Sequence, residues 1–375
     1  MINNPFAKTM LLVVSGSVAF VIIIMLIISE SAMSEVARMT VADNGTTTVS
    51  LNIAGIANTT VSINGSVHTF ADTGVVDSLT VSVPPNRIIT IESKSAYSIL
   101  ELYCYNNSLT SLDVSGLSSL KRLYCHNNLL TSLNVSGLSF LSELSCENNS
   151  LTSLNVSGLS ALIGLNCSGN SLSSLSVSGL SSLRELFCFN NSLSSLNLFG
   201  LYSLELLLCF DNSLTSLNVS GLSSLRDLFC YNNSLSSLNL FGLSSLERLY
   251  CFNNSLSSLS VFGLSSLREL LCYDNSLFSL DASGLSSLEQ LHCFNNSLTY
   301  LDVNGCTALS FLQAQNQTVE IDVPFNDNRT STNIYFNGIA YRFTIGEGFA
   351  IKLPESISHR TSFSGTTSIF SVANR

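Results

Sequence analysis

Residues 183–203 read LRELFCFNNSLSSLNLFGLYS, and residues 204–224 read LELLLCFDNSLTSLNVSGLSS. The same register extends in both directions, because cysteine recurs every 21 residues, ten times in all, from Cys104 to Cys293. Leucine always stands two residues before each cysteine and five and eight residues after it, asparagine three after it and glycine twelve after it. A unit this short cannot bury its own apolar side chains, so the pattern predicts units that stack around one continuous core.

Two stretches of each unit alternate between inward and outward side chains. Leu102-Tyr103-Cys104 has strand periodicity, which predicts a parallel sheet of ten strands spaced about 4.8 Å apart and therefore about 45 Å long. Leu133-Asn134-Val135 also alternates, so we expect a short extended strand, not a helix, on the opposite, convex side. Gly137 and its equivalents permit the bend that follows. Asn107 and its successors point inward, so their amides must hydrogen-bond the backbones of adjacent coils.

The ten cysteines occupy an inward strand position, and an unpaired cysteine there is most simply a small buried hydrophobic residue. A zinc site needs four converging ligands, which a single file does not provide, and a catalytic thiolate needs partial exposure. Disulfides between neighbouring coils are the nearer alternative, because Cα atoms about 4.8 Å apart fall in the allowed range, although parallel side chains hold their Cβ atoms farther apart than the preferred ~3.8 Å. We therefore expect buried free thiols, with Cys306 as a further core substitution at a leucine position.

The unit L-x-x-L-x-C-x-x-N-x-L-x-x-L-x-V-x-G-L-x-x resembles the leucine-rich-repeat family, particularly the short, cysteine-bearing repeats of bacterial surface proteins. The ten full units span Ile99 to Ala308, which is 210 of the 375 residues. The resemblance implies a mostly β solenoid with little helix in the repeats, a parallel concave sheet and short extended convex segments.

The positions that the fold does not require are the outward ones that flank each cysteine. From Phe187 onward these two columns are almost wholly aromatic or apolar, which is unusual for a soluble monomer and marks a candidate interaction surface. The candidate ligand-binding residues are Phe187, Phe189, Phe210, Phe229, Tyr231, Tyr250, Phe252, Tyr273 and Phe294. Stacked aromatic columns also stabilise a sheet without any ligand. Polar residues at Ser145, Glu147, Asn166 and Ser168 indicate that the fold does not demand rings there.

The segments outside the repeats predict a four-part chain. Residues 1–39 contain the uncharged stretch Met10 to Ile28, long enough to span a bilayer, with Lys8 before it and Glu30 and Glu35 after it, so the remainder should lie outside the cytoplasm. A cleaved signal peptide is the rival interpretation. Residues 40–98 form a β-rich cap with a hairpin turn at Asn64-Gly65. Residues 99–323 hold the ten units and a degenerate one, and residues 324–375 form a β-like cap, with a turn at Asn337-Gly338, and a tail.

The composition and motifs favour binding over catalysis. Only 11% of residues are charged and the net charge is −10, which argues against a nucleic-acid partner. His126 and His292 would lie about 38 Å apart at the strand spacing, and we find no metal, cofactor or nucleophile motif. We expect an extracytoplasmic, membrane-tethered binding protein, adhesin-like or receptor-like, and not an enzyme. Its partners would be a protein or glycan on the concave face and the membrane through residues 10–28, or it is secreted if that segment is cleaved. The alternative is a structural spacer or surface-coat protein without a specific ligand.

Overall fold

The computed structural model describes residues 35–93, 98–298 and 300–314, together with strands at 322–325, 332–336, 339–343, 349–352 and 373–374. The predicted membrane segment Met10 to Ile28, the turn at Asn337-Gly338 and most of the tail after Pro354 lie outside these residues. Within the described part of the chain, no helix is both long enough and apolar enough to cross a membrane.

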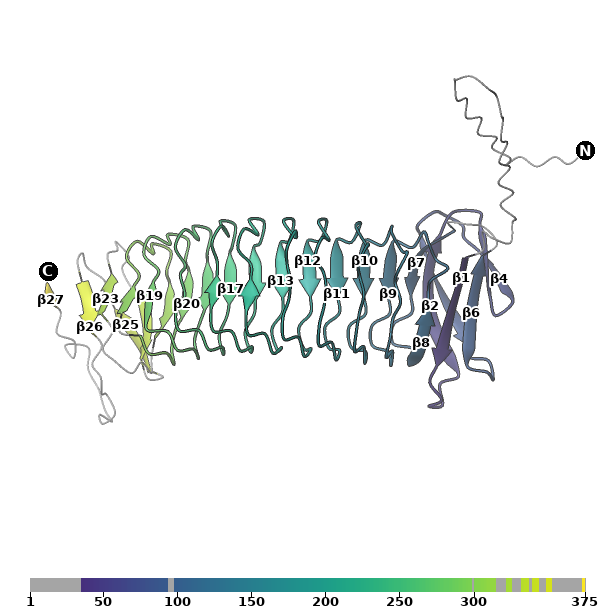
Figure 1. The fold of residues 1–375 in the computed structure, drawn as a ribbon, viewed down its shortest axis with the longest axis horizontal. Helices are drawn as coiled ribbons and strands as arrows, with labels where there is room; N and C mark the ends of the chain where they lie inside the picture. Colours follow the sequence, from purple (N-terminus) through teal and green to yellow (C-terminus); the bar gives the residue numbers. More distant parts are fainter. Residues whose placement is uncertain are drawn as a thin grey trace, which may run out of the picture.

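The repeats form a gently curved solenoid in which one coil follows another along a single axis (Figure 1). The first strand of each coil pairs in parallel and in register with its neighbours, so that Leu186 lies opposite Leu165 and Leu207. The strands of this concave sheet are β7 (Ile99–Tyr103), β9 (Arg122–Tyr124), β10 (Glu143–Ser145), β11 (Gly164–Asn166), β12 (Glu185–Phe187), β13 (Leu206–Leu208), β15 (Asp227–Phe229), β17 (Arg248–Tyr250), β18 (Glu269–Leu271), β20 (Gln290–His292) and β22 (Phe311–Gln313). The predicted parallel sheet is confirmed.

The opposite side of each coil is extended and short, as expected, and the described residues of the repeats contain no helix. Single bridges link Asp113, Asn134, Asn155, Ser176 and Asn197 in successive coils. The longer convex pieces are β8 (Leu109–Asp113), β14 (Leu217–Asn218), β16 (Leu238–Asn239), β19 (Ser279–Asp281) and β21 (Tyr300–Asp302). Gly137 adopts a φ of 86°, in the left-handed region that glycine enters without strain, at the predicted bend.

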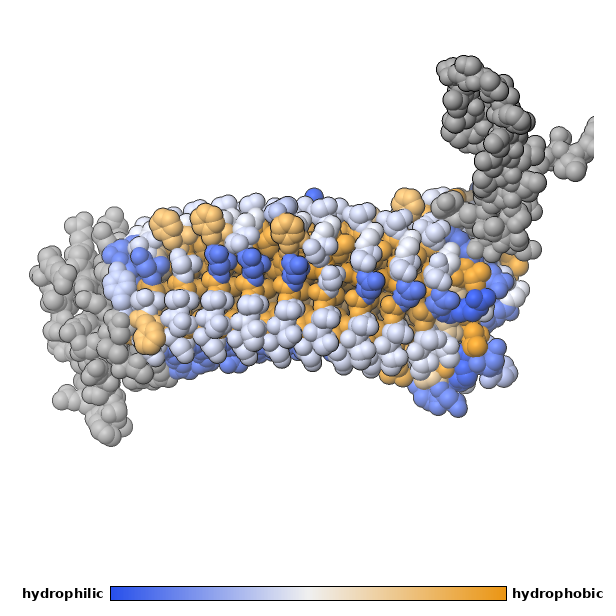
Figure 2. Space-filling view, in the orientation of Figure 1, coloured by the Kyte–Doolittle hydropathy of each residue, from blue (hydrophilic) through white to orange (hydrophobic). Residues whose placement is uncertain are grey.

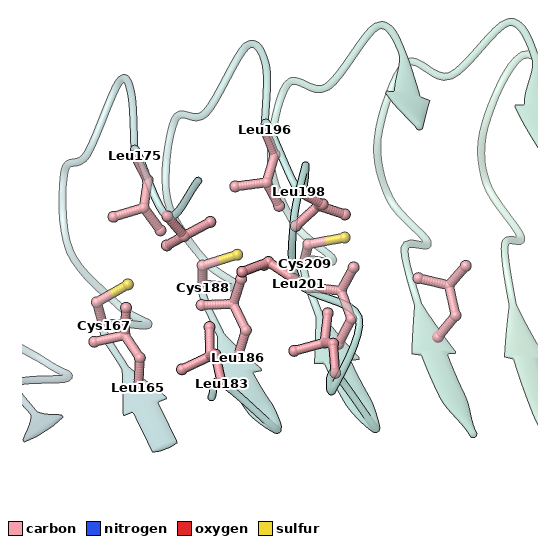
Figure 3. Packing of buried hydrophobic residues seen from close by; sticks show 14 of the residues in the cluster. Leu165, Cys167, Leu175, Leu183, Leu186, Cys188, Leu196, Leu198, Leu201 and Cys209 are labelled. Atoms are coloured by element: carbon pink, nitrogen blue, oxygen red, sulfur yellow. The ribbon is translucent and has the colours of Figure 1, made fainter. Parts of the chain in front are cut away.

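Leucine and cysteine side chains from every coil fill the interior as continuous columns. Figure 3 shows Cys167, Cys188 and Cys209 at equivalent positions of three neighbouring coils, among leucines such as Leu186 and Leu201. All ten cysteines of the column are fully buried and none forms a disulfide. Cys306 is also buried and its thiol lies 3.1 Å from the carbonyl oxygen of Ala282, as a core substitution requires.

We expect the native protein to resist thiol reagents. Burial raises the pKa of the Cys104 and Cys230 thiols to about 12, so at mildly alkaline pH the reactive thiolate is absent and the sulfur is inaccessible. Titration with a chromogenic disulfide should detect almost none of the eleven cysteines in the folded protein, and all eleven after denaturation without reductant. Detection of two or fewer in the denatured protein would mean that the column is cross-linked.

The inward asparagines form the predicted ladder between coils. The side-chain amide of Asn128 donates to the carbonyls of Cys104, Cys125 and His126 at 3.0, 2.9 and 3.3 Å. Its oxygen accepts from the backbone N–H groups of Asn107 and Leu109 at 3.0 and 2.9 Å. Each asparagine therefore satisfies backbone groups of two coils at a turn where the backbone cannot satisfy them itself.

Six strands precede the first coil and cover its open end. They are β1 (Glu35–Val41), β2 (Thr48–Gly55), β3 (Thr60–Ile63), β4 (Ser66–Thr69), β5 (Val76–Ser82) and β6 (Ile88–Ser93). β2 pairs antiparallel with β7 and β1 pairs antiparallel with β8, so these strands extend both sheets of the solenoid. β3 and β4 join through the predicted hairpin turn, where Asn64 and Gly65 have φ values of 49° and 85°. The first strand begins at Glu35, ahead of the boundary expected at residue 40.

The strands after the last full coil continue both sheets. β24 (Thr332–Phe336) pairs in parallel with β22 and antiparallel with β25 (Ile339–Phe343). β23 (Asp322–Phe325) pairs in parallel with β21 and antiparallel with β26 (Phe349–Lys352), which pairs with β27 (Ala373–Asn374). Ala314 fills the cysteine position of the degenerate unit and is fully buried.

Candidate functional site

The concave sheet carries two columns of outward side chains, which we call the first column (before each cysteine) and the second column (after it). Along each strand the middle leucine is buried, as Leu186 is in β12, and the residue before the cysteine is half-buried. All nine predicted ligand-binding rings lie in these two columns, and each of them is half-buried, not fully exposed. Eight of the nine rings are partly covered because they stack on one another.

The second column forms an uninterrupted stack of six rings. Neighbouring ring centroids lie 4.3–4.4 Å apart with interplanar angles of 8–10°. The stack runs through Phe189, Phe210, Tyr231, Phe252, Tyr273 and Phe294. Because neighbours cover both faces of the four inner rings, the ring edges are the part of the stack that meets solvent. Tyr231 and Tyr273 make no side-chain hydrogen bond within the described residues, and burial raises the pKa of both phenols, so both hydroxyls stay protonated donors.

The first column is shorter and carries charge beside its rings. Phe229 and Tyr250 stack at 4.2 Å and 4°, while leucines stand at the neighbouring positions in β13 and β18. The guanidinium of Arg248 lies 5.7 Å from the centre of the Phe229 ring and pairs with Asp227. Burial and a hydrogen bond from its hydroxyl to Glu269 raise the pKa of Tyr250 to about 12. Phe187, the remaining predicted residue, lies between Asn166 and Leu208 and joins neither stack.

A polar cluster separates these stacks from a smaller aromatic group at the first coils. The hydroxyl of Ser145 lies 3.0 Å from Nδ1 of His126 and 2.5 Å from a carboxylate oxygen of Glu147. His126 also stacks on Tyr105 at 4.6 Å. Sequence reasoning considered these residues singly and missed the cluster. The same Nδ1 atom of His126 faces the serine hydroxyl and, at 3.7 Å, a carboxylate oxygen of Glu147, so the histidine cannot relay a proton between them as it does in a hydrolase triad.

The most exposed aromatic residues lie on another part of the surface, and sequence reasoning missed them. Phe199, Phe241 and Phe262 are 74%, 82% and 94% exposed. All three stand eleven residues after a cysteine, where most coils have serine. Figure 2 shows apolar side chains that protrude along the upper edge of a face on which rows of polar residues leave an apolar band visible between them. The departure from serine was the available signal, because a fold that tolerates serine there does not need phenylalanine.

Two shallow hollows on the described surface lie away from the aromatic columns. One, of about 270 Å³, is lined by Phe262, Asp281 and four serines beside Leu259. The other, of about 400 Å³, is lined by Glu205, Arg226, Glu247 and three serines. The described residues hold no group of histidine, cysteine or carboxylate side chains suited to a metal ion.

Comparisons with known proteins point to one family. No protein-family model matches the chain, and the search of curated proteins finds no match. Among solved structures, the chain is similar to the functional domain of InlJ from Listeria monocytogenes, which includes a cysteine ladder, with 29% identity over 67% of this chain and 52% of that one, and a TM-score of 0.57.

It is also similar to YopM from Yersinia enterocolitica WA-314, with 30% identity over 58% of this chain and 47% of that one, and a TM-score of 0.52. The chain thus spans about half the length of each of these two structures. With ten in-register units, the parallel concave sheet, the asparagine ladder and the buried cysteine column, this chain belongs to the leucine-rich-repeat family, with short, cysteine-bearing repeats.

Proposed function

We propose that this chain is an extracytoplasmic, membrane-tethered binding protein, adhesin-like or receptor-like, whose concave aromatic columns recognise a protein. The observation that carries the proposal is the six-ring stack of the second column, from Phe189 to Phe294. Its edges form a continuous apolar strip along six coils, and aromatic strips of this kind are typical of protein interfaces. The tether is residues 10–28, and cleavage there would release a secreted form.

The stacking geometry favours a protein partner over a glycan. Sugars bind aromatic side chains mainly by laying C–H groups on an open ring face, whereas the inner rings of the stack have neighbours on both faces. Ring edges carry partial positive charge, so they suit backbone carbonyls and apolar side chains. The protonated hydroxyls of Tyr231 and Tyr273 add donors for backbone or carboxylate acceptors.

The second candidate, a structural spacer or coat protein, is favoured by the same stack for a different reason. Each ring is half-buried by its neighbours, so the stack stabilises the sheet whether or not a ligand binds. The two functions differ in one measurable respect. A binding surface enriches ligands from a library, and these ligands no longer bind when the rings are replaced. A spacer enriches no ligand.

A random peptide library displayed on phage, panned against the full chain, tests the proposal. We expect enriched peptides that no longer bind when Phe189, Phe210, Phe252 and Phe294 are changed to serine. The matched control changes Phe140 and Phe278, exposed rings away from the columns, and should retain binding. Circular dichroism must show that both variants remain folded. If the serine variant unfolds, a second variant with leucine at the same four positions takes its place, because it removes the rings and keeps apolar side chains there.

Peptides that bind the folded serine variant as well as the wild type would contradict the concave-face proposal. A glycan array probed in parallel decides the class of ligand. Sugar binding that the serine variant loses, without any enriched peptide, would overturn the preference for a protein partner. Absence of any enriched ligand in both experiments would favour the spacer.

A further inference from the structure

Six consecutive coils carry one charged residue each at the position four residues before the cysteine, and the sign alternates without exception. This flank row consists of Arg184, Glu205, Arg226, Glu247, Arg268 and Glu289. Within the chain, each arginine pairs with the glutamate that follows it, at 3.2, 2.5 and 3.7 Å. All six side chains reach solvent, and the central ones line the hollow of about 400 Å³ with Ser224, Ser245 and Ser266.

The order of charges in the flank row is complementary to the order of charges in the same row read in the opposite direction. If a second copy faces the first and runs antiparallel, each arginine of the row lies opposite a glutamate. Arg184 meets the second copy's residue 289, Glu205 meets 268 and Arg226 meets 247, and the same three pairs recur by symmetry. We propose that this flank binds a second copy of the chain across a twofold axis. The axis lies in the contact between the two copies, perpendicular to the solenoid axis and level with the midpoint between Arg226 and Glu247.

Other placements satisfy the charges less well. A parallel copy in the same register puts like charges opposite each other across the whole row. A parallel copy shifted by one coil loses one contact and leaves an open, head-to-tail arrangement that does not close. The antiparallel arrangement uses all six charges and closes as an isologous dimer, the commonest symmetry of soluble oligomers.

A second row of side chains follows the same axis. Phe199, Phe241 and Phe262 each stand six residues before a member of the flank row. Because the axis exchanges Glu205 with Arg268, it also exchanges the coil of Phe199 with the coil of Phe262, so these two exposed rings lie at symmetry-related coils. Phe241 is exchanged with Ser220 in the same way. Association would therefore bring exposed rings toward each other along the rim of a charged contact.

The dimer should be weak and sensitive to salt. The six strands of the flank row span about 24 Å at the sheet spacing, which gives a contact at the small end of specific interfaces. Exposed ion pairs contribute little individually and are screened by salt. The hollow that the flank row lines contains no residue of the two columns, so dimerisation leaves the proposed ligand surface free and does not rest on the proposed function.

Charge exchange within a pair separates dimerisation from pairing inside the chain. In the variant Arg184→Glu/Glu205→Arg the pair inside the chain and the net charge are both retained. Across the dimer axis, however, four attractive contacts become repulsive, since residue 184 now faces a glutamate and residue 205 faces an arginine. We expect the dimer dissociation constant to rise by about tenfold or more. Further addition of Arg268→Glu/Glu289→Arg restores every contact across the axis and should restore the dimer.

The measurement is light scattering or sedimentation of the full chain in mild detergent, over concentrations that bracket the micromolar range, at low and high ionic strength. The four-substitution variant places like charges on neighbouring coils at two points of its own row, against one in the two-substitution variant. If the charges acted only within one chain, the second exchange would therefore weaken the dimer further. The same is expected if the two copies were parallel and shifted by one coil. Recovery of the dimer supports the antiparallel axis, whereas failure to recover, or a monomeric wild-type chain at low salt, overturns it.

The aromatic row provides an independent arm of the same experiment. Phe199→Ser/Phe262→Ser should weaken the dimer, whereas Phe140→Ser, an exposed ring outside the six coils, should leave it unchanged. If the two variants change the dimer dissociation constant equally, the aromatic row is not part of the interface. Retention of dimer strength in all charge variants would mean that the flank row acts within one chain only.

Discussion

Replacement of Asn128 by alanine is expected to lower the free energy of unfolding by about 3–5 kcal/mol, because several buried backbone groups lose their partners at once. Asn128 is buried, and its amide joins two coils by accepting from two backbone N–H groups and donating to backbone carbonyls of both coils. The side chain also begins a chain of contacts to the N-terminal strands. Asn107, whose N–H it accepts, exchanges hydrogen bonds of 2.9 and 2.7 Å with the backbone of Ser50 in β2.

Urea unfolding followed by circular dichroism measures this loss, and hydrogen exchange locates it. The amides of Asn107 and Leu109 should lose protection first, since Asn128 holds both. The matched control is Asn134→Ser in the same coil, at an exposed convex position where Ser176 and Ser260 stand in other coils. A change of less than about 1 kcal/mol in Asn128→Ala, the value of a single net hydrogen bond, would contradict the ladder as a main source of stability.

Replacement of Glu35 by alanine should destabilise the N-terminal end of the solenoid by about 3–5 kcal/mol, for the same reason. Its carboxylate is buried and accepts from the backbone N–H groups of Ser98 and Ile99 at 3.0 and 2.9 Å. It also accepts from the hydroxyls of Ser98 and Ser119, so it links β1 to the start of the first coil and to the turn beyond it. Its loss would leave these buried groups unsatisfied and loosen the strands that cover the open core.

Thermal unfolding and limited proteolysis of the full chain measure this effect. Glu35→Gln keeps an acceptor oxygen and the shape of the side chain, so it should fall between the wild type and the alanine variant. Glu92→Gln, on the exposed side of β6, is the control and should be neutral. Equal stability of the wild type and Glu35→Ala would show that the N-terminal strands are held by their sheet pairing alone.

The two residues show what a sequence pattern can and cannot predict. Asn128 belongs to a position that recurs in ten coils, and a recurring polar residue among leucines can only be an inward group that bonds the backbone. Glu35 occurs once, and its sequence position after an apolar stretch suggested a charge flanking a membrane segment. Its actual partners lie 63 to 84 residues away, at Ser98, Ile99 and Ser119. Contacts of this length leave no local pattern.

The candidate site also combines features that the sequence predicts with features that it does not predict. The two aromatic columns could be located from the sequence because strand alternation decides which side chains point outward. The state of the rings could not, because stacking depends on the side-chain rotamers and on the spacing between coils. The result matters for function, since stacked rings present edges to a partner and hide their faces.

The sequence by itself determined the solenoid, the concave strand and extended convex segment of each coil, the asparagine ladder and the buried cysteine column. The physical reason is that each of these follows from a period of 21 residues and from alternation within the unit. Only the tertiary structure decided the stacking of Phe189 through Phe294 and the burial of Glu35. These arise where residues of different coils or of the N-terminal strands meet, and such contacts depend on how the coils pack against one another.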